Sequence, residues 1–189
     1  MKLFGPKKTK TTRGPSYYDR ENIVHTLRDL NSIYLPKGKL KHNTDKVIMY
    51  NDLSLSDITI KKLKNVIGPE DYKLEKVQDL KDYQILFYRH SSEKFNYLMQ
   101  FHFCENNFLF VNNMIRSSYV LSDEDKQYIM TRFKEKYYPD IEFDFKNGFD
   151  LQIIDKTGNF FYTIDSVNFS ITYINNSSKF KELITKYNS

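Results

Sequence analysis

Two short segments of the chain hold residue types that could do chemistry. His102 and Cys104 alternate along a predicted strand, so their side chains share one face with Cα atoms about 7 Å apart. A cysteine beside a histidine can form a thiol nucleophile with its base, or supply two metal ligands. Zinc needs two further ligands, and the nearest candidates are His90 and Glu105. The pattern therefore favours a semi-buried cysteine next to a polar histidine over a reactive pair.

An acidic alternation follows later in the chain. Asp140, Glu142 and Asp144 recur at period two, which would place three carboxylates on one strand face, as in a divalent-metal or acid/base site. An exposed strand face whose alternate residues are aromatic or aliphatic produces the same string, and we favour that interpretation. The three acids remain the candidate metal ligands.

Other catalytic signatures are missing from the sequence. The chain has no glycine-rich phosphate loop, no HExxH or CxxC motif and no nucleophile elbow. The sequence therefore predicts a protein with no catalytic residue and no cofactor.

The surplus positive charge is confined to the first thirteen residues. The net charge is +5, and the cations that produce it are Lys2, Lys7, Lys8, Lys10 and Arg13. Without these five cations, 24 basic residues oppose 24 acidic ones. The tail could contact nucleic-acid phosphates without sequence specificity, with a log–log salt slope of at most about −4.5. A solubilising terminus is the interpretation that we favour.

Composition indicates a cytoplasmic protein with a substantial core. Hydrophobic residues make up 40% of the chain, with 15 Phe and 15 Tyr but no Trp and no Ala, a bias that we attribute to an AT-rich genome. The single cysteine, Cys104, excludes a disulfide framework within the chain. No signal peptide and no apolar run long enough for a membrane span are visible.

Helix signals recur four times along the chain. Each predicted helix begins at a Ser or Asp cap and carries an apolar stripe at helical spacing. The predicted helices run from Ser16 or Asp19 to Tyr34, from Ser56 to Ile67, from Ser122 to Tyr137, and from Ser177 or Ser178 to Tyr187. Gly68 and Pro69 form the clearest helix stop.

Strand signals occupy most of the remaining sequence, and residues 39–45 read as a polar loop. The predicted strands are 47–50, 83–89, 95–104, 108–115, 149–154, 160–164 and 167–173. With Asn106 and Asn107 as central turn residues, Phe103 would pair with Phe110, and His102 with the next residue.

These elements predict an α+β fold with antiparallel meanders and helices packed on one face. We expect a basic tail, residues 1–16, and a single domain, residues 17–189. The domain has possible halves at 17–118 and 119–189 that form a degenerate tandem of helix-plus-three-strand units.

Residues 55–115 carry a family resemblance. The helix Leu55–Ile67 with its Gly68–Pro69 stop, followed by the hairpin sequences Leu98–Phe103 and Asn106–Leu109, resembles modules of the outer-membrane assembly lipoprotein and β-lactamase-inhibitor-protein superfamily. The resemblance implies a small binding module without catalysis and identifies no functional residue.

The function we expect is therefore a non-catalytic interaction module of the inhibitor, immunity or adaptor type. Its partner would be another protein that docks on an aromatic-rich sheet face or groove. Two alternatives stay open: non-specific nucleic-acid binding through the tail, and a metal-dependent or thiol enzyme.

Overall fold

The computed structural model describes residues 23–35, 40–77, 80–117, 120–137, 139, 145, 148–166 and 168–188. The basic tail lies outside these ranges, as do Asp140, Glu142 and Asp144. Nucleic-acid contact through the tail and metal binding by the three acids therefore stay predictions.

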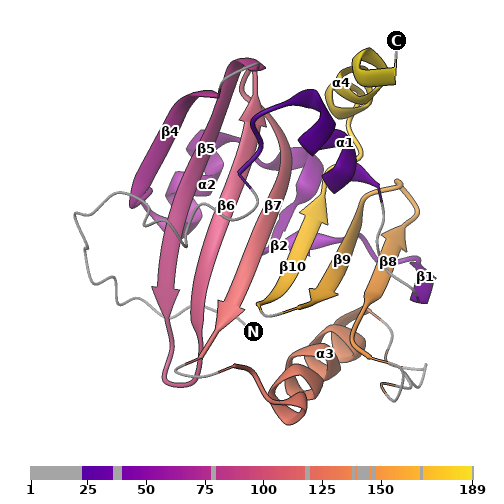
Figure 1. Cartoon of the computed structure of the whole chain (residues 1–189). Coiled ribbons are helices and arrows are strands. Elements are labelled where there is room, and N and C mark those ends of the chain that lie inside the picture. Colours follow the sequence, from indigo (N-terminus) through magenta and orange to yellow (C-terminus); the bar gives the residue numbers. More distant parts are fainter. Residues whose placement is uncertain are drawn as a thin grey trace.

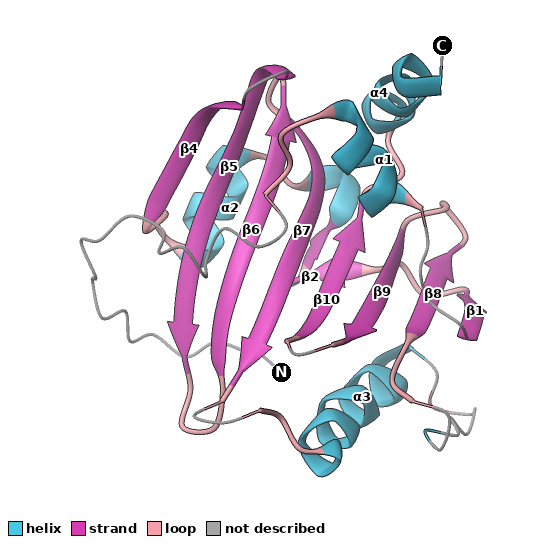
Figure 2. Cartoon of the chain, in the orientation of Figure 1, coloured by secondary structure: helices cyan, strands magenta, loops and turns pink. Residues whose placement is uncertain are grey.

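Helices and strands in the described ranges are shown in Figures 1 and 2. The helices are α1 Leu27–Tyr34, α2 Ile60–Ile67, α3 Asp123–Tyr137 and α4 Ser178–Asn188, with a short 3₁₀ turn at Leu55–Asp57. The strands are β1 Leu40–Thr44, β2 Met49–Tyr50, β3 Leu53–Ser54, β4 Tyr72–Val77, β5 Leu80–Ser91, β6 Asn96–Cys104, β7 Asn107–Arg116, β8 Leu151–Asp155, β9 Phe160–Asp165 and β10 Phe169–Ile174. No helix in these ranges combines the length and apolar character that a bilayer span requires.

Two antiparallel meanders join into one sheet. The strand order is β1-β8-β9-β10-β7-β6-β5-β4, and β2 pairs separately with β3. The joint is an antiparallel pairing of β7 with β10, in which Asn113 lies opposite Ile171. β1 adds to the far edge, parallel to β8. The α+β class and the antiparallel meanders are confirmed.

Helices cover both faces of this sheet (Figure 1). α2, α3 and the β2–β3 hairpin pack on one face, and α1 and α4 pack on the other. The expectation that the helices share one face is wrong, because the central strands bury side chains on both faces. Gln100 and His102, on the second face of β6, are 1% and 0% exposed. The aromatic side chains of the central strands are therefore covered on both faces and are not available as a docking surface.

Aromatic rings meeting edge to face fill the α2/α3 side of the core. Phe101 is fully buried, and its ring centroid lies 5.1 Å from that of Tyr50 and 5.5 Å from that of Tyr88, with near-perpendicular planes. Such pairs contribute beyond the area that they bury. The large aromatic residues thus do the close packing in a chain without alanine.

Helix caps fix where the helices begin. α1 starts at Leu27 because Thr26 and Asp29 form a capping box, with the Thr26 hydroxyl accepting from the Asp29 N–H. The predicted start at Ser16 or Asp19 is therefore wrong for this helix. α2 is capped by Thr59 in place of Ser56. The predicted caps of α3 and α4 are confirmed, since Ser122 and Ser177 hydroxyls accept from N–H groups of the first turns.

Two strands and one turn differ from the sequence expectation. Residues 39–45, read as a loop, contain β1, whose polar sequence suits an exposed sheet edge. β4 was also missed, so α2 precedes four strands where three were expected. The central residues of the β6–β7 turn are Glu105 and Asn106, with φ of 49° and 64°, so Phe103 lies opposite Phe108 and its predicted pairing with Phe110 is wrong. Leu109 is an extra, bulged residue, which places His102 opposite Phe110.

Replacing Phe101 by Ala tests the aromatic core. The variant should lower the free energy of unfolding by about 3–5 kcal/mol, because it removes a fully buried ring and leaves a cavity. Urea unfolding measures the change. Val120→Ala is the control, since Val120 is 71% exposed and should change stability by less than about 0.5 kcal/mol. Similar losses in the two variants would contradict this account of the core.

Candidate binding pocket

His102 sits inside the protein, where it cannot act as a base. Its ring stacks on that of Phe110 with centroids 4.0 Å apart, and its Nδ1 lies 2.9 Å from the Tyr83 hydroxyl oxygen. Burial lowers the pKa of His102 to about 3. The imidazole is therefore neutral at physiological pH, and its Nε2 has no hydrogen-bond partner among the described residues.

Cys104 shares the α1/α4 face of β6 with His102 but is not activated by it. The thiol is 3% exposed and lies 3.9 Å from the carbonyl oxygen of Lys81, to which it donates. Burial raises its pKa, so the sulfur stays protonated at neutral pH, whereas a reactive cysteine needs a lowered pKa. Within the described ranges, no group of His, Cys, Asp and Glu side chains is placed to hold a metal ion.

A pocket of about 460 Å³ lies at one end of the sheet. Strands β6, β8 and β10 run in the same direction, so the β6–β7 turn, the β8–β9 turn and the start of α4 meet there (Figure 1). The segment between β3 and α2 completes the lining. The lining residues are Val47, Ser54, Ser56, Ile58, Thr59, Asn106, Asn107, Phe108, Thr157, Asn159, Asn175, Asn176 and Ser177.

Amides and hydroxyls dominate this lining, and none of the lining side chains is a carboxylate, an amine, a guanidinium, an imidazole or a thiol. The nearby cation Lys179 is engaged by carboxylates of Glu105 and Glu182, at 2.9 and 3.4 Å. The pocket therefore offers neutral hydrogen-bonding groups.

Three of the asparagines are held through their carbonyl oxygens. Asn106 accepts from Gln84 Nε2 at 3.3 Å, Asn159 accepts from the Asn176 N–H at 2.9 Å, and Asn176 accepts from the Tyr34 hydroxyl at 2.5 Å. In the part of the chain that the structure describes, none of their amide nitrogens makes a hydrogen bond. Three lining residues thus carry an NH₂ group without a hydrogen-bond acceptor among the described residues.

The other two asparagines are held the opposite way round. Asn175 Nδ2 donates to the Phe108 carbonyl at 2.9 Å, and its backbone N–H donates to the Leu109 carbonyl at 2.9 Å, so this residue satisfies the bulge in β7. Asn107 Nδ2 donates to the Glu105 carbonyl at 3.1 Å. Within the described ranges their carbonyl oxygens accept no hydrogen bond. The pocket therefore also has two amide acceptors.

A buried carboxylate fixes the β8–β9 wall of the pocket. Asp155, 4% exposed, accepts from the backbone N–H groups of Ile48, Thr157 and Asn159 at 3.0, 2.8 and 3.0 Å, and from the Thr157 hydroxyl at 2.6 Å. These bonds satisfy most of the acceptor capacity of the carboxylate. One side chain therefore sets the position of the turn and of the β1–β2 segment beside it.

Gly158 lets this turn pack against an asparagine. Its φ is +82°, and a Cβ at this position would lie 2.4 Å from Asn176 Nδ2. A positive φ is a conformation that glycine adopts without steric cost, which suits Gly158 to this turn. The same glycine also makes room for a side chain of the pocket.

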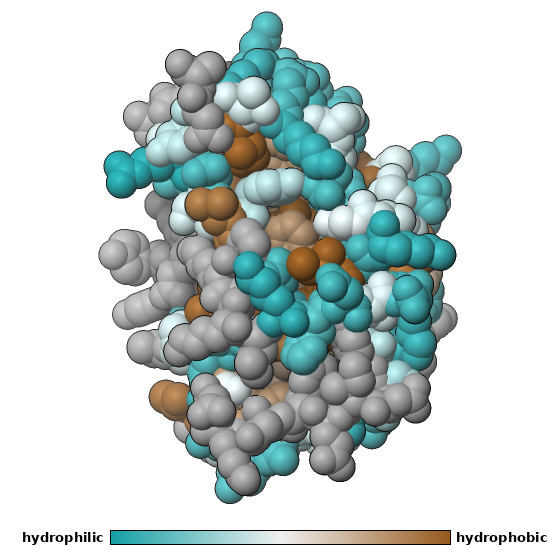
Figure 3. Space-filling view, turned by 90° about the vertical axis from the view of Figure 1, so that its right-hand side faces the viewer, coloured by the Kyte–Doolittle hydropathy of each residue, from teal (hydrophilic) through white to brown (hydrophobic). Residues whose placement is uncertain are grey.

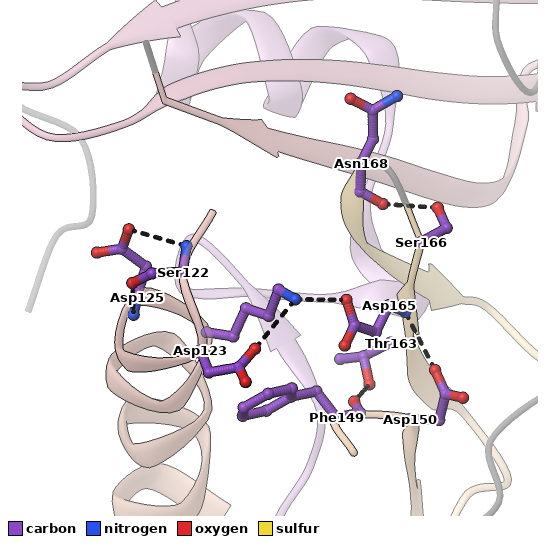
Figure 4. A network of polar contacts seen from close by, with 10 residues as sticks. Ser122, Asp123, Asp125, Phe149, Asp150, Thr163, Asp165, Ser166 and Asn168 are labelled. Atoms are coloured by element: carbon purple, nitrogen blue, oxygen red, sulfur yellow. Dashed lines mark hydrogen bonds and ion pairs between the residues drawn. The ribbon is translucent and has the colours of Figure 1, made fainter. Parts of the chain in front are cut away.

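A second polar network lies at the opposite end of the sheet (Figure 4). The Lys126 ammonium is shared by Asp165 at 2.9 Å and Asp123 at 3.4 Å, and it lies 5.6 Å from the centre of the Phe149 ring. The Thr163 hydroxyl bonds the Phe149 carbonyl and accepts from the Leu151 N–H. These groups satisfy one another and tie α3 to β8 and β9, which is a structural role.

Sequence reasoning missed the pocket, although its signal was present. Asn106-Asn107 and Asn175-Asn176 are doublets at the ends of two strands; the first was predicted only as a turn, and the second was assigned no role. The candidates that it did single out, His102 and Cys104, belong to the core.

Asp155→Asn should loosen the pocket wall. One carboxylate oxygen becomes an NH₂ group that faces an N–H donor, so the free energy of unfolding should fall by about 1–3 kcal/mol. Urea unfolding measures the loss, and hydrogen exchange should show weaker protection at Ile48 and Thr157. Asp57→Asn is the matched control, because the Asp57 side chain is 63% exposed. Unchanged exchange at these amides would refute this account of the turn.

His102 should make stability depend on pH. Its pKa is about 3 in the folded protein against a usual value of 6.5, so the unfolded chain binds more protons between these values. The free energy of unfolding should therefore fall as pH is lowered from about 6.5 toward 3, by up to about 1.4 kcal/mol per pH unit. His102→Gln should reduce this slope in urea unfolding at pH 4.5, 5.5 and 6.5. Equal slopes in the two proteins would contradict the buried neutral imidazole.

Comparison with known proteins leaves the pocket as the main guide to function. No protein-family model, no curated protein and no solved structure matches the chain. The resemblance of residues 55–115 to the lipoprotein and inhibitor modules stays a prediction.

Proposed function

We propose that this chain is a non-catalytic binding module for another protein in the cytoplasm, and that the asparagine pocket is its binding site. The observation that carries the proposal is the set of five lining asparagines that each use one end of the amide in a hydrogen bond within the protein and leave the other end without a partner among the described residues.

The chemistry of the lining supports binding in preference to catalysis. Carboxamides and hydroxyls donate and accept hydrogen bonds, but they do not ionise near neutral pH. The Asn159 N–H donates to the Asp155 carboxylate and the Asn175 side chain donates to the Phe108 carbonyl, and these two asparagines are 5% and 7% exposed. Such preorganised groups lose little conformational entropy when a ligand binds.

The surface around the sheet edge also supports polar recognition. Viewed from the β1 side, the described surface is mainly hydrophilic, and apolar residues form small areas between hydrophilic ones (Figure 3). Within the described part of this side, a partner would meet mainly hydrogen-bonding groups.

A single isosteric variant tests whether the pocket binds a protein. Asn159→Asp keeps the oxygen that accepts from the Asn176 N–H and turns the free NH₂ into a charged acceptor. Nuclease-treated lysate is passed over tagged full-length protein, and the recovered partner is identified by mass spectrometry, purified and titrated by calorimetry. Asn159→Asp should weaken its binding at least about tenfold, because a donor becomes a repelling acceptor.

Asn96→Asp is the matched control for charge and shape. Asn96 lies at the opposite end of β6, and its oxygen accepts from the Ser91 hydroxyl at 2.7 Å, so this variant makes the same change away from the pocket. It should leave the affinity unchanged. A partner that binds wild type and Asn159→Asp equally, or the recovery of no saturable partner, would overturn the proposed function.

A further inference from the structure

We propose that the pocket recognises the main chain of an extended, neutral peptide segment of its partner. This inference rests on the proposed function and names the group that the site binds. Three free NH₂ groups and two free carbonyl oxygens at one site form the donor and acceptor set that a peptide main chain requires.

The match is one of identical chemical groups. An asparagine side chain is a carboxamide, so its NH₂ donates to a peptide carbonyl and its oxygen accepts from a peptide N–H, as backbone groups do between strands. Asn159 supplies a donor, and Asn175 supplies an acceptor. Recognition through the main chain gives affinity that depends little on the side chains of the segment.

An anionic ligand fits the site less well. A carboxylate or phosphate is only an acceptor and would face the carbonyl oxygens of Asn107 and Asn175 without a donor to offer them. Lys179, two residues after the lining residue Ser177, is engaged by two carboxylates. The acceptor half of the pocket would remain unsatisfied with such a ligand.

A sugar ring also finds little to stack on. Phe108 is the aromatic residue of the lining, and it is 2% exposed, so its face is covered by the core. The remaining apolar lining residues are Ile58, which is 3% exposed, and Val47, which is 40% exposed. Main-chain amides need no ring face, and Val47 can contact a side chain of the segment.

The lining comes from two parts of the fold, which suits an extended segment. The amides project from the end of the sheet, whereas Ser54, Ser56 and Thr59 belong to the segment that leads into α2. An extended chain has polar groups along both of its edges, so it can bond to both parts. The volume of about 460 Å³ lies within the range of ligand pockets.

A display library of linear 12-residue peptides, panned against the full-length protein, supplies the probe. Selected peptides are titrated by fluorescence polarisation against wild type, Asn159→Asp and the control Asn96→Asp. Binding should weaken at least about tenfold in Asn159→Asp and stay unchanged in the control. Asn106→Asp, which likewise keeps its accepting oxygen, replaces Asn159→Asp if that variant does not fold.

An amide-to-ester scan of the best peptide then separates main-chain from side-chain recognition. At least one ester, which removes an N–H and keeps the side chain, should weaken binding about tenfold, and the Asn159 side-chain NH₂ signals should shift in ¹⁵N spectra when the peptide binds. Esters that all bind like the parent peptide would overturn the inference. Failure to select any linear peptide would also overturn the inference. Binding of glycans in an array that is lost in Asn159→Asp would overturn it as well. In each of these cases the proposed function would still stand if Asn159→Asp loses its binding to the protein partner.

Discussion

The antiparallel pairing of β7 with β10 is the constraint on which the rest of the structure depends. It joins the last strands of two meanders. A polar side chain stabilises the pairing inside the core, because Asn113 Nδ2 donates to the Ile171 carbonyl at 3.1 Å and Asn113 Oδ1 accepts from the Tyr50 hydroxyl at 2.7 Å. Because β7 and β10 are antiparallel, β6, β8 and β10 end on the same side. The joint therefore gathers two turns and a helix start, distant in sequence, around one pocket.

Much of the fold was predictable because its signals are local. Gly68, with φ of +86°, ends α2 as its sequence indicates, and Ser122 caps α3 because its hydroxyl and the acids that follow suit a first turn. β1 was missed because an edge strand needs backbone pairing more than apolar side chains, and its partner β8 lies far along the chain. The shifted turn has a similar cause, since the bulge at Leu109 matters only once Asn175 bonds the neighbouring carbonyls.

The site was not predictable, for a related reason. Asparagine doublets at strand ends are typical of turns, and local sequence does not say which turns will meet. Their meeting depends on the β7–β10 register and on Asp155, whose four hydrogen bonds reach two separate segments. His102 and Cys104 attracted attention by residue type, but burial moves the pKa of each in the direction that removes its reactivity. Residue types alone identify possible chemistry, and only the environment decides whether it is available.

The parallel pairing of β1 with β8 has a consequence for how the chain reaches this structure. Among the described strands β1 comes first in the sequence, yet its partner comes after α3, and the hydrogen bond from the Ile48 N–H to Asp155 in the same region spans 107 residues. Contacts of such long range form late, because closing a large loop is entropically unfavourable until the intervening strands are in place. During synthesis β1 cannot pair until β8 has been made, so we expect this pairing at the sheet edge to be among the last contacts to form.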